Sequence, residues 1–254
     1  MVTMATSLSS IATEVLRPGL LISAQSLAEV QLVLNSGTRW LDLKDPLQGS
    51  LGRPSLDLVA EMLKLEIPRS VQVSVAGGEL KDWLPSMNRD LAATLPARVY
   101  LKMALSDCQE TDWQSLAEVI SVSLLRRSQL ILVHYADTSA ARSPGWREIL
   151  DAIKGMGGRY VLIDTFRKES GGLLDHLGAD QLQGMIADAR KMKLGIALAG
   201  SLKMEQLPIL SKLSVDWLGV RGAVCKDAVR TGTICSDRLQ QAVAMFPVCS
   251  PNGI

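Results

Sequence analysis

The sequence has few of the residues from which metal sites and disulfide frameworks are built. Its 254 residues include two histidines and four cysteines, and the cysteines form no CxxC pair. The histidines complete no ligand signature with them. We therefore expect no metal centre, and we expect the four thiols to be reduced, as they are in a cytoplasmic protein.

Surplus charge and long apolar segments are also lacking. The formal net charge is +1 at pH 7, so the chain has no broad basic surface of the kind that non-specific nucleic-acid binding requires. No apolar run approaches the length of a membrane span, and residues 1–19 lack the basic start and continuous apolar run of a signal peptide. Neither a nucleic acid nor a membrane is an expected partner.

The apolar residues that are present are mainly aliphatic and follow a repeating order. Hydrophobic residues make up 47% of the chain and aromatic residues 4%, a composition typical of parallel sheets that are covered on both faces. Short β-like runs alternate with segments of helical period, which predicts repeated βα units. The predicted strands are Leu20–Ala24, Trp40–Lys44, Val71–Ala76, Val99–Ala104, Leu130–Tyr135, Tyr160–Thr165, Gly195–Gly200 and Trp217–Gly222.

Eight βα units predict the α/β class and a single-domain, TIM-type (β/α)8 barrel over residues 20–246. We interpret residues 1–19 and 247–254 as tails. Ser26 is a candidate N-cap of the first helix, with Glu29 completing a capping box. A doubly wound open sheet is the alternative fold, although no GxGxxG motif follows the first strand.

Charged residues end the second predicted strand. In the run Trp40–Pro46 (WLDLKDP), the period of two places Asp42 and Lys44 on one face and Leu41 and Leu43 on the other. In a barrel the leucines would face the helices and the charged pair would face the axis, where charges are costly unless they are paired or used. Barrel enzymes place their catalytic groups at these strand ends. A structural Asp–Lys ion pair is the other explanation.

The fourth and sixth strands repeat this pattern. Tyr100 and Lys102 share one face of the fourth strand, and Asp164 near the end of the sixth is followed in the loop by Arg167 and Lys168. Because alternate strands of a barrel supply each layer of inward side chains, these charges are predicted to meet in one polar layer. Convergence from three segments favours a functional site over separate ion pairs.

Two inward lysines in one layer predict amine chemistry. Neighbouring ammonium groups disfavour each other's charged form, so Lys44 or Lys102 should lose its proton readily and act as a nucleophile on a carbonyl carbon. The other lysine could then accept or donate a proton, oriented by Asp42 or Asp164. The residues alone do not say which lysine takes which part. No organic cofactor is needed for these steps.

Glycine-containing turns follow the seventh and eighth strands. Gly200 and Ser201 lie in the first turn, and Arg221, Gly222 and Ala223 lie in the second. Such turns expose backbone N–H donors, and many barrels bind a phosphate with the loops after these two strands. One turn alone would be a weak signal, because glycines also permit tight turns. The two turns together predict a phosphate site.

Several motifs occur in an order that resembles a known family. They are Leu41–Pro46 (LDLKDP), Gly49–Gly52 (GSLG), Ile163–Thr165 (IDT), Ala197–Ser201 (ALAGS) and Gly219–Ala223 (GVRGA). Together they resemble the (5-formylfuran-3-yl)methyl phosphate synthase family, also called 4-(hydroxymethyl)-2-furancarboxaldehyde-phosphate synthase. The resemblance extends over about residues 20–239.

The resemblance implies a lyase that condenses two molecules of glyceraldehyde 3-phosphate into a phosphorylated furan aldehyde. Phosphate and water are lost, and the product serves methanofuran or methylofuran biosynthesis in C1 metabolism. By resemblance, Lys44 forms a Schiff base with the substrate and Lys102 accepts a proton. Asp42, Asp164 and Lys168 would complete the catalytic set, and the glycine turns would bind phosphate.

Two other functions fit the same residues. Another Schiff-base aldolase would share the lysine and the phosphate site but would release an ordinary aldol, so the product mass separates the two. A non-catalytic barrel that binds a phosphosugar would be expected to lose the inward lysines, which this sequence keeps. Exposed apolar positions on the helices leave open whether the chain forms a homo-oligomer.

Overall fold

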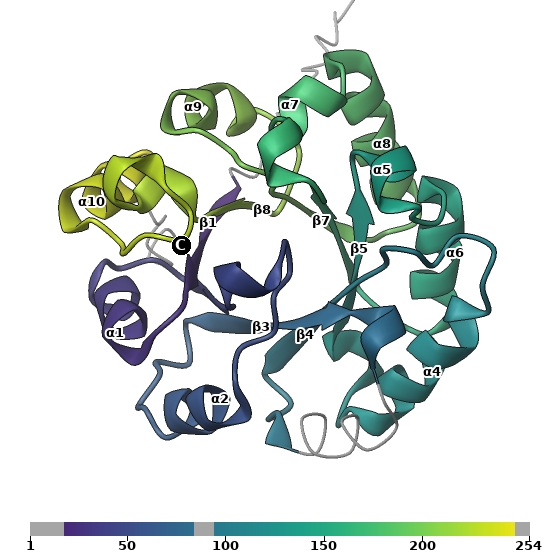
Figure 1. Ribbon diagram of the computed structural model, residues 1–254, viewed down its shortest axis with the longest axis horizontal. Helices are drawn as coiled ribbons and strands as arrows, with labels where there is room; N and C mark the ends of the chain where they lie inside the picture. The colour runs from purple at the N-terminus through teal and green to yellow at the C-terminus, as the bar shows by residue number, and fades with distance from the viewer. Residues whose placement is uncertain (1–17, 84–93, 247–254) are drawn as a thin grey trace, which may run out of the picture.

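The computed structural model describes residues 18–83 and 94–246, and its eight strands form a closed parallel barrel in sequence order (Figure 1). Because β1 pairs with β8, the ring has no edge, and the doubly wound alternative is wrong. The predicted tails lie outside the described residues, except for positions 18 and 19. The strands are β1 (Gly19–Ala24), β2 (Trp40–Leu43), β3 (Gln72–Glu79), β4 (Val99–Ala104), β5 (Leu130–Tyr135), β6 (Tyr160–Asp164), β7 (Gly195–Leu198) and β8 (Trp217–Val220).

All eight predicted strands occur, and most of the differences lie at their carboxyl ends. β2, β6, β7 and β8 end one or two residues before the predicted positions. After β7 the backbone turns at Gly200 (φ 104°) and Ser201 (φ 49°), which extended structure does not allow. β3 instead continues to Glu79, with a register irregularity after Ala76. Most of the predicted site residues therefore lie where strands become loops, at the barrel mouth, whereas Asp42 and Lys102 lie within β2 and β4.

Helices surround the barrel (Figure 1). The α-helices are α1 (Leu27–Asn35), α2 (Leu56–Leu63), α4 (Trp113–Ser123), α5 (Thr138–Ala141), α6 (Trp146–Gly155), α7 (Leu173–His176), α8 (Ala179–Lys191), α9 (Leu207–Leu210) and α10 (Ser236–Ala244). The 3-10 helices are η1 (Pro46–Gln48), η2 (Leu80–Asp82), η3 (Arg127–Gln129), η4 (Lys168–Ser170), η5 (Met204–Gln206), η6 (Gly222–Val224) and η7 (Lys226–Ala228). Leu41 and Leu43 are fully buried in the apolar layer between strands and helices, as predicted.

Four aromatic side chains fill the amino-terminal end of the barrel interior. Trp40, Tyr100, Tyr160 and Trp217 come from the four even-numbered strands, and the ring centroids of Trp40 and Trp217 are 4.0 Å apart. A glycine on β7 makes room for them, since a Cβ at Gly195 would lie 2.1 Å from the Tyr160 ring. The barrel is thus packed at this end and hollow toward the carboxyl ends of its strands.

The loop after β2 folds back across part of the barrel mouth, near the centre of the ring in Figure 1. Leu51 is 2% exposed and belongs to an inner apolar cluster with residues of β3, β4 and β5. The Ser50 hydroxyl donates to the Thr165 carbonyl, 2.7 Å away. Gly52 closes the loop through a 2.9 Å bond from the Asp45 N–H, and a Cβ at Gly52 would lie 1.9 Å from the Asp45 carbonyl oxygen. The hollow therefore remains beside β6, β7, β8 and β1.

Glu29 has a different role from the predicted one. Ser26 is the N-cap of α1, as expected, and its hydroxyl accepts a bond from the Glu29 N–H at 3.3 Å. The Glu29 carboxylate does not complete the capping box at Ser26. It accepts a bond from the Gln25 N–H and forms a buried ion pair with Arg221 instead. The ion pair with the buried guanidinium stabilises the fold more than the capping bond would, because water can instead accept a bond from the Ser26 N–H.

The ion pair joins α1 to the end of β8, across the seam where the barrel closes. Arg221 Nη1 lies 2.5 Å from Glu29 Oε2, and the two side chains are 4% and 5% exposed. The same guanidinium donates to the carbonyls of Ser23, Arg230 and Gly232. One buried arginine thus holds β1, α1 and the loop after β8 together.

We expect Glu29→Gln to lower the free energy of unfolding by about 3 kcal/mol, because it leaves the buried Arg221 charge without its partner. Urea denaturation followed by circular dichroism measures this. Glu61→Gln makes the same chemical change at an exposed site on α2 and should stay within about 0.5 kcal/mol of the unmodified chain. Equal stability of the two variants would contradict a structural role for the pair.

Candidate active site

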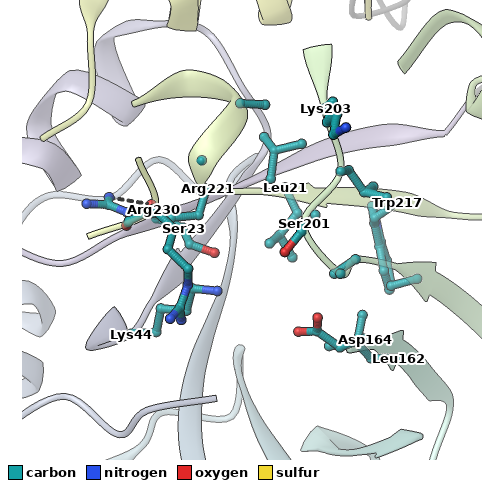
Figure 2. Close-up of a pocket in the computed structure, with 18 of the residues that line it drawn as sticks. Leu21, Ser23, Lys44, Leu162, Asp164, Ser201, Lys203, Trp217, Arg221 and Arg230 are labelled. Atoms are coloured by element: carbon teal, nitrogen blue, oxygen red, sulfur yellow. Dashed lines mark hydrogen bonds between the residues drawn. The ribbon is translucent and has the colours of Figure 1, made fainter. Parts of the chain in front are cut away.

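A cavity of about 430 Å³ opens at the carboxyl ends of the strands. Its deep part is apolar and reaches Trp40 and Trp217, and its upper part is lined by charged residues and by the loops after β6, β7 and β8. Figure 2 shows Lys44 and Arg230 on one side of this cavity and Asp164 and Ser201 on the other. Carboxyl ends of barrel strands are where such enzymes hold their substrates.

Asp42 and Lys102 form the deepest charged contact. Lys102 Nζ lies 2.7 Å from Asp42 Oδ1, with the side chains 5% and 0% exposed. Asp42 also accepts bonds from the hydroxyls of Ser23, at 2.9 Å, and Ser74, at 2.7 Å. The ammonium and the two hydroxyls compensate the carboxylate for its lost hydration and fix its orientation.

Asp164 and Lys168 form a second pair nearer the mouth. Lys168 Nζ lies 2.5 Å from Asp164 Oδ1 and also donates to the Thr165 carbonyl and hydroxyl, at 2.6 and 3.1 Å. Burial alone would raise the pKa of Asp164, but Lys168, Lys44 and the Thr165 N–H outweigh it and lower that pKa. Of the two adjacent cations after β6, Lys168 lines the cavity, whereas Arg167 is exposed.

Lys44 lies between these pairs without a partner of its own. It is 8% exposed, and among the described residues its amine makes no hydrogen bond or ion pair. Burial lowers the pKa of Lys44 from 10.5 to about 7; attraction to Asp164 opposes this shift and repulsion from Lys168 adds to it. A large fraction of this amine is therefore neutral, and nucleophilic, near pH 7.

The structure divides the predicted polar layer between two depths. Asp42 pairs with Lys102, while Lys44 lies two residues further along the chain, just after β2 ends, and is attracted to Asp164. Period two correctly placed all four side chains inside the barrel. It could not show that two carboxylates pair with Lys102 and Lys168, leaving Lys44 free.

The turns after β7 and β8 bring unpaired backbone donors to the cavity wall. Gly200, Ser201, Gly222 and Ala223 line the cavity, and their N–H groups have no acceptor among the described residues. A Cβ at Gly200 would lie 2.9 Å from the Thr165 side chain, and its φ of 104° also favours glycine. Unpaired N–H groups at a cavity wall suit an anion.

Arg221 does not supply a guanidinium to this wall. Its five N–H donors are matched by five bonds, two to Glu29 and one each to the carbonyls of Ser23, Arg230 and Gly232. The sequence-based assignment of Arg221 to phosphate binding therefore needs correction, since no donor of its side chain is left for a ligand. Its position after a glycine-rich strand end could not reveal Glu29, which lies 192 residues away.

Three cationic residues of the cavity wall were missed. Lys203, Arg230 and Arg238 line it from the loops after β7 and β8 and from α10. Arg230 Nη2 donates to the Gly49 carbonyl at 2.8 Å, which links the loops after β8 and β2. Arg230 and Arg238 lie 10 and 18 residues beyond the end of β8 at Val220, and Lys203 lies five beyond the end of β7 at Leu198, too far along the chain for strand periodicity to place them.

His134 takes no part in the cavity. It is 4% exposed and packs edge-on against Trp146, with ring centroids 5.4 Å apart, and burial lowers its pKa to about 4.

Within the described residues, no group of three or more His, Cys, Asp or Glu side chains is arranged to hold a metal ion. In the same part of the chain, no helix combines the length and apolar character needed to cross a membrane.

Sequence comparison bears directly on this site. A model of the 4-HFC-P synthase family matches residues 20–243. This chain belongs to the 4-HFC-P synthase family. The (5-formylfuran-3-yl)methyl phosphate synthase of Methanococcus aeolicus is 29% identical over 234 residues, which cover 89% of this chain and 98% of that protein. The protein of the same name from Archaeoglobus fulgidus is 26% identical over 212 residues, 81% of this chain and 90% of the other.

Solved structures outside the 4-HFC-P synthase family share the fold at low identity. Phosphoribosyl anthranilate isomerase from Thermus thermophilus aligns with a TM-score of 0.61 at 16% identity, covering 89% of this chain and 97% of the other. A native KDPGal structure aligns with a TM-score of 0.54 at 11% identity, covering 89% and 93%. These likenesses confirm the TIM-type barrel and say nothing about the reaction.

We expect the Lys44 amine to titrate near pH 7. After reductive methylation with 13C-formaldehyde, the methyl resonance that Lys44→Arg removes should shift with an inflection near 7, while surface lysines titrate at about 10. Asp164→Asn should lower this pKa further, because the largest attraction that favours the ammonium is lost. Asp57→Asn, an exposed change on α2, serves as the control. Titration of Lys44 together with the surface lysines would refute the assignment.

Proposed function

We propose that this chain condenses two molecules of glyceraldehyde 3-phosphate into (5-formylfuran-3-yl)methyl phosphate, releasing phosphate and water, through a Schiff base on Lys44. The family match supports this reaction, and the product would serve methanofuran or methylofuran biosynthesis. The observation that carries the proposal is the unpaired, buried amine of Lys44, with a pKa of about 7 at the wall of the cavity.

The first step uses the neutral Lys44 amine. One glyceraldehyde 3-phosphate first takes its ketone form, as a proton leaves C2 and another is added at C1. The amine attacks the ketone carbon, and loss of water gives an imine. A protonated imine withdraws electrons from the adjacent carbon, so a C–H proton there becomes acidic. The carbanion equivalent then attacks the aldehyde of the second triose phosphate and forms the new carbon–carbon bond.

Lys102 and the Asp164–Lys168 pair supply the proton transfers. Lys102 is oriented by Asp42, whose other bonds come from serine hydroxyls, so the lysine has a defined position below Lys44. Lys102 would pass a proton to Asp42, 2.7 Å away, and the resulting neutral amine would accept the C–H proton. Lys168 lies nearer the loops and, oriented by the Asp164 carboxylate, would protonate the departing oxygen atoms during elimination and ring closure.

Trapping by borohydride tests the imine. Incubation with glyceraldehyde 3-phosphate and sodium borohydride should give a reduced adduct on Lys44, located by peptide mass mapping. Lys44→Arg should lose both the adduct and the furan product, because a guanidinium stays protonated and cannot form the imine. Lys154→Arg, at an exposed position on α6, should keep both.

The same experiment separates the rival functions by product mass. An aldol product with the adduct would indicate another Schiff-base aldolase. If the unmodified chain gives neither an adduct nor a product, the proposal is refuted, and the non-catalytic phosphosugar-binding barrel becomes the better explanation. A furan product without an adduct would keep the reaction but remove the imine from it.

Lys102→Gln should separate imine formation from proton transfer. We expect turnover to fall by about 10²–10⁴-fold, the usual cost of removing a general base. Borohydride trapping at Lys44 should persist, provided that it is measured at several pH values, since loss of the Lys102 charge raises the Lys44 pKa. Loss of trapping at every pH would show that Lys102 is required before the imine forms.

A further inference from the structure

The proposed reaction brings two phosphate groups into one cavity, and this inference rests on that proposal. The N–H groups of Gly200, Ser201, Gly222 and Ala223, which line the cavity and have no acceptor among the described residues, would bind one of them. A second phosphate needs donors elsewhere on the same wall. Because a phosphate dianion loses hydration on entering, those donors should be cationic and free of protein acceptors.

Most of the cationic side chains at the cavity are already committed. Lys168 uses its three ammonium donors on Asp164 and Thr165, and Arg221 uses all five of its donors. Lys102 is buried against Asp42, and Lys44 is the nucleophile of the proposed reaction. None of these four is available to hold a phosphate.

Lys203 and Arg238 stand beside the backbone donors of the first site. Arg238 Nε donates to the Ala223 carbonyl at 2.9 Å, and Lys203 follows Ser201 by two residues. In Figure 2, Lys203 lies above Ser201. Both cations would therefore reinforce the first anion site instead of forming another.

Arg230 is the remaining guanidinium of the wall. It makes one hydrogen bond, from Nη2 to the Gly49 carbonyl at 2.8 Å, and no carboxylate among the described residues is within ion-pair distance. Burial lowers its pKa, and attraction to Asp164 and Glu169 opposes that shift, so the group is partly desolvated with its countercharges beyond ion-pair distance. Four N–H donors remain in a planar fork that matches phosphate oxygens.

The backbone around Arg230 is held in place by Arg221. Arg221 Nε donates to the Arg230 carbonyl at 2.9 Å, and Nη2 donates to the Gly232 carbonyl at 2.6 Å. Two bonds from one buried arginine flank the residue and limit the movement of its loop. Figure 2 places Arg230 on the Lys44 side of the cavity, across from Ser201.

We propose that Arg230 forms a second phosphate subsite, separate from the backbone donors after β7 and β8, which receives the phosphate of the second triose phosphate. Arg221 acts as a positioning residue for this subsite. The cavity would thus bind two phosphates with two kinds of donor, the backbone N–H groups after β7 and β8 and the Arg230 guanidinium, which reaches toward Gly49 in the loop after β2.

Binding of carbonyl-free analogues tests the subsite without turnover. Isothermal titration calorimetry would compare a hexitol 1,6-bisphosphate with a hexitol 6-phosphate, on the full chain and on Arg230→Gln, Arg230→Lys and Lys226→Gln. We expect Arg230→Gln to weaken bisphosphate binding about tenfold or more and to leave monophosphate binding nearly unchanged. The bisphosphate affinity of Arg230→Lys should lie between those of the unmodified chain and Arg230→Gln, since an ammonium keeps the charge but not the planar fork of donors.

Lys226→Gln removes a charge from an exposed position of the same loop and should bind both analogues like the unmodified chain. Unchanged bisphosphate affinity in Arg230→Gln would overturn the proposal, and so would an equal loss for both analogues, which would assign Arg230 to the first site. Absence of bisphosphate binding to the unmodified chain would also overturn it. Failure of the proposed function alone gives a different result: the unmodified chain would still bind the bisphosphate tightly but would form no furan product.

Discussion

Closing eight parallel strands into a ring leaves every second side chain of each strand facing the axis. In this chain that constraint sorts the inward residues by depth. Aromatic rings from the four even strands fill the amino-terminal end, and charged residues occupy the carboxyl end. The floor of rings gives the charged residues a low-dielectric base, so each charge above it must find a partner or be neutralised, a lysine by losing a proton and an aspartate by gaining one.

The way in which charges pair at the mouth decides the chemistry of Lys44. Asp42 is held by Lys102 and two serine hydroxyls, and Asp164 is held by Lys168. Lys168 is in turn anchored by Thr165, which keeps the carboxylate from moving to Lys44. Burial then dominates at the remaining amine, and it favours the neutral form. The reactive amine thus depends on the bonds of its neighbours as much as on its own position.

Two arginines that follow β8 differ in how many of their N–H donors the protein already uses, and this difference distinguishes a structural role from a binding role. Arg221 is buried, fully bonded and paired with Glu29, so its contribution is to stability and to loop position. Arg230 is half buried with one protein acceptor, so its guanidinium can still take a ligand. The residue nearer to the strand end is the structural one, the reverse of what proximity to the glycine turn suggests.

The sequence by itself determined the eight strands and the inward face of Asp42, Lys44, Lys102 and Asp164, and it favoured the barrel. The strands and the inward face follow from local periods, because a strand alternates its side chains, whereas the pairing of β1 with β8 decided between the barrel and the open sheet. Only the tertiary structure decided that the charges occupy two depths, that Lys44 is the unpaired lysine, and that Arg230 and not Arg221 has free donors. Pairing depends on distances between segments up to about 190 residues apart, and no local pattern encodes those distances.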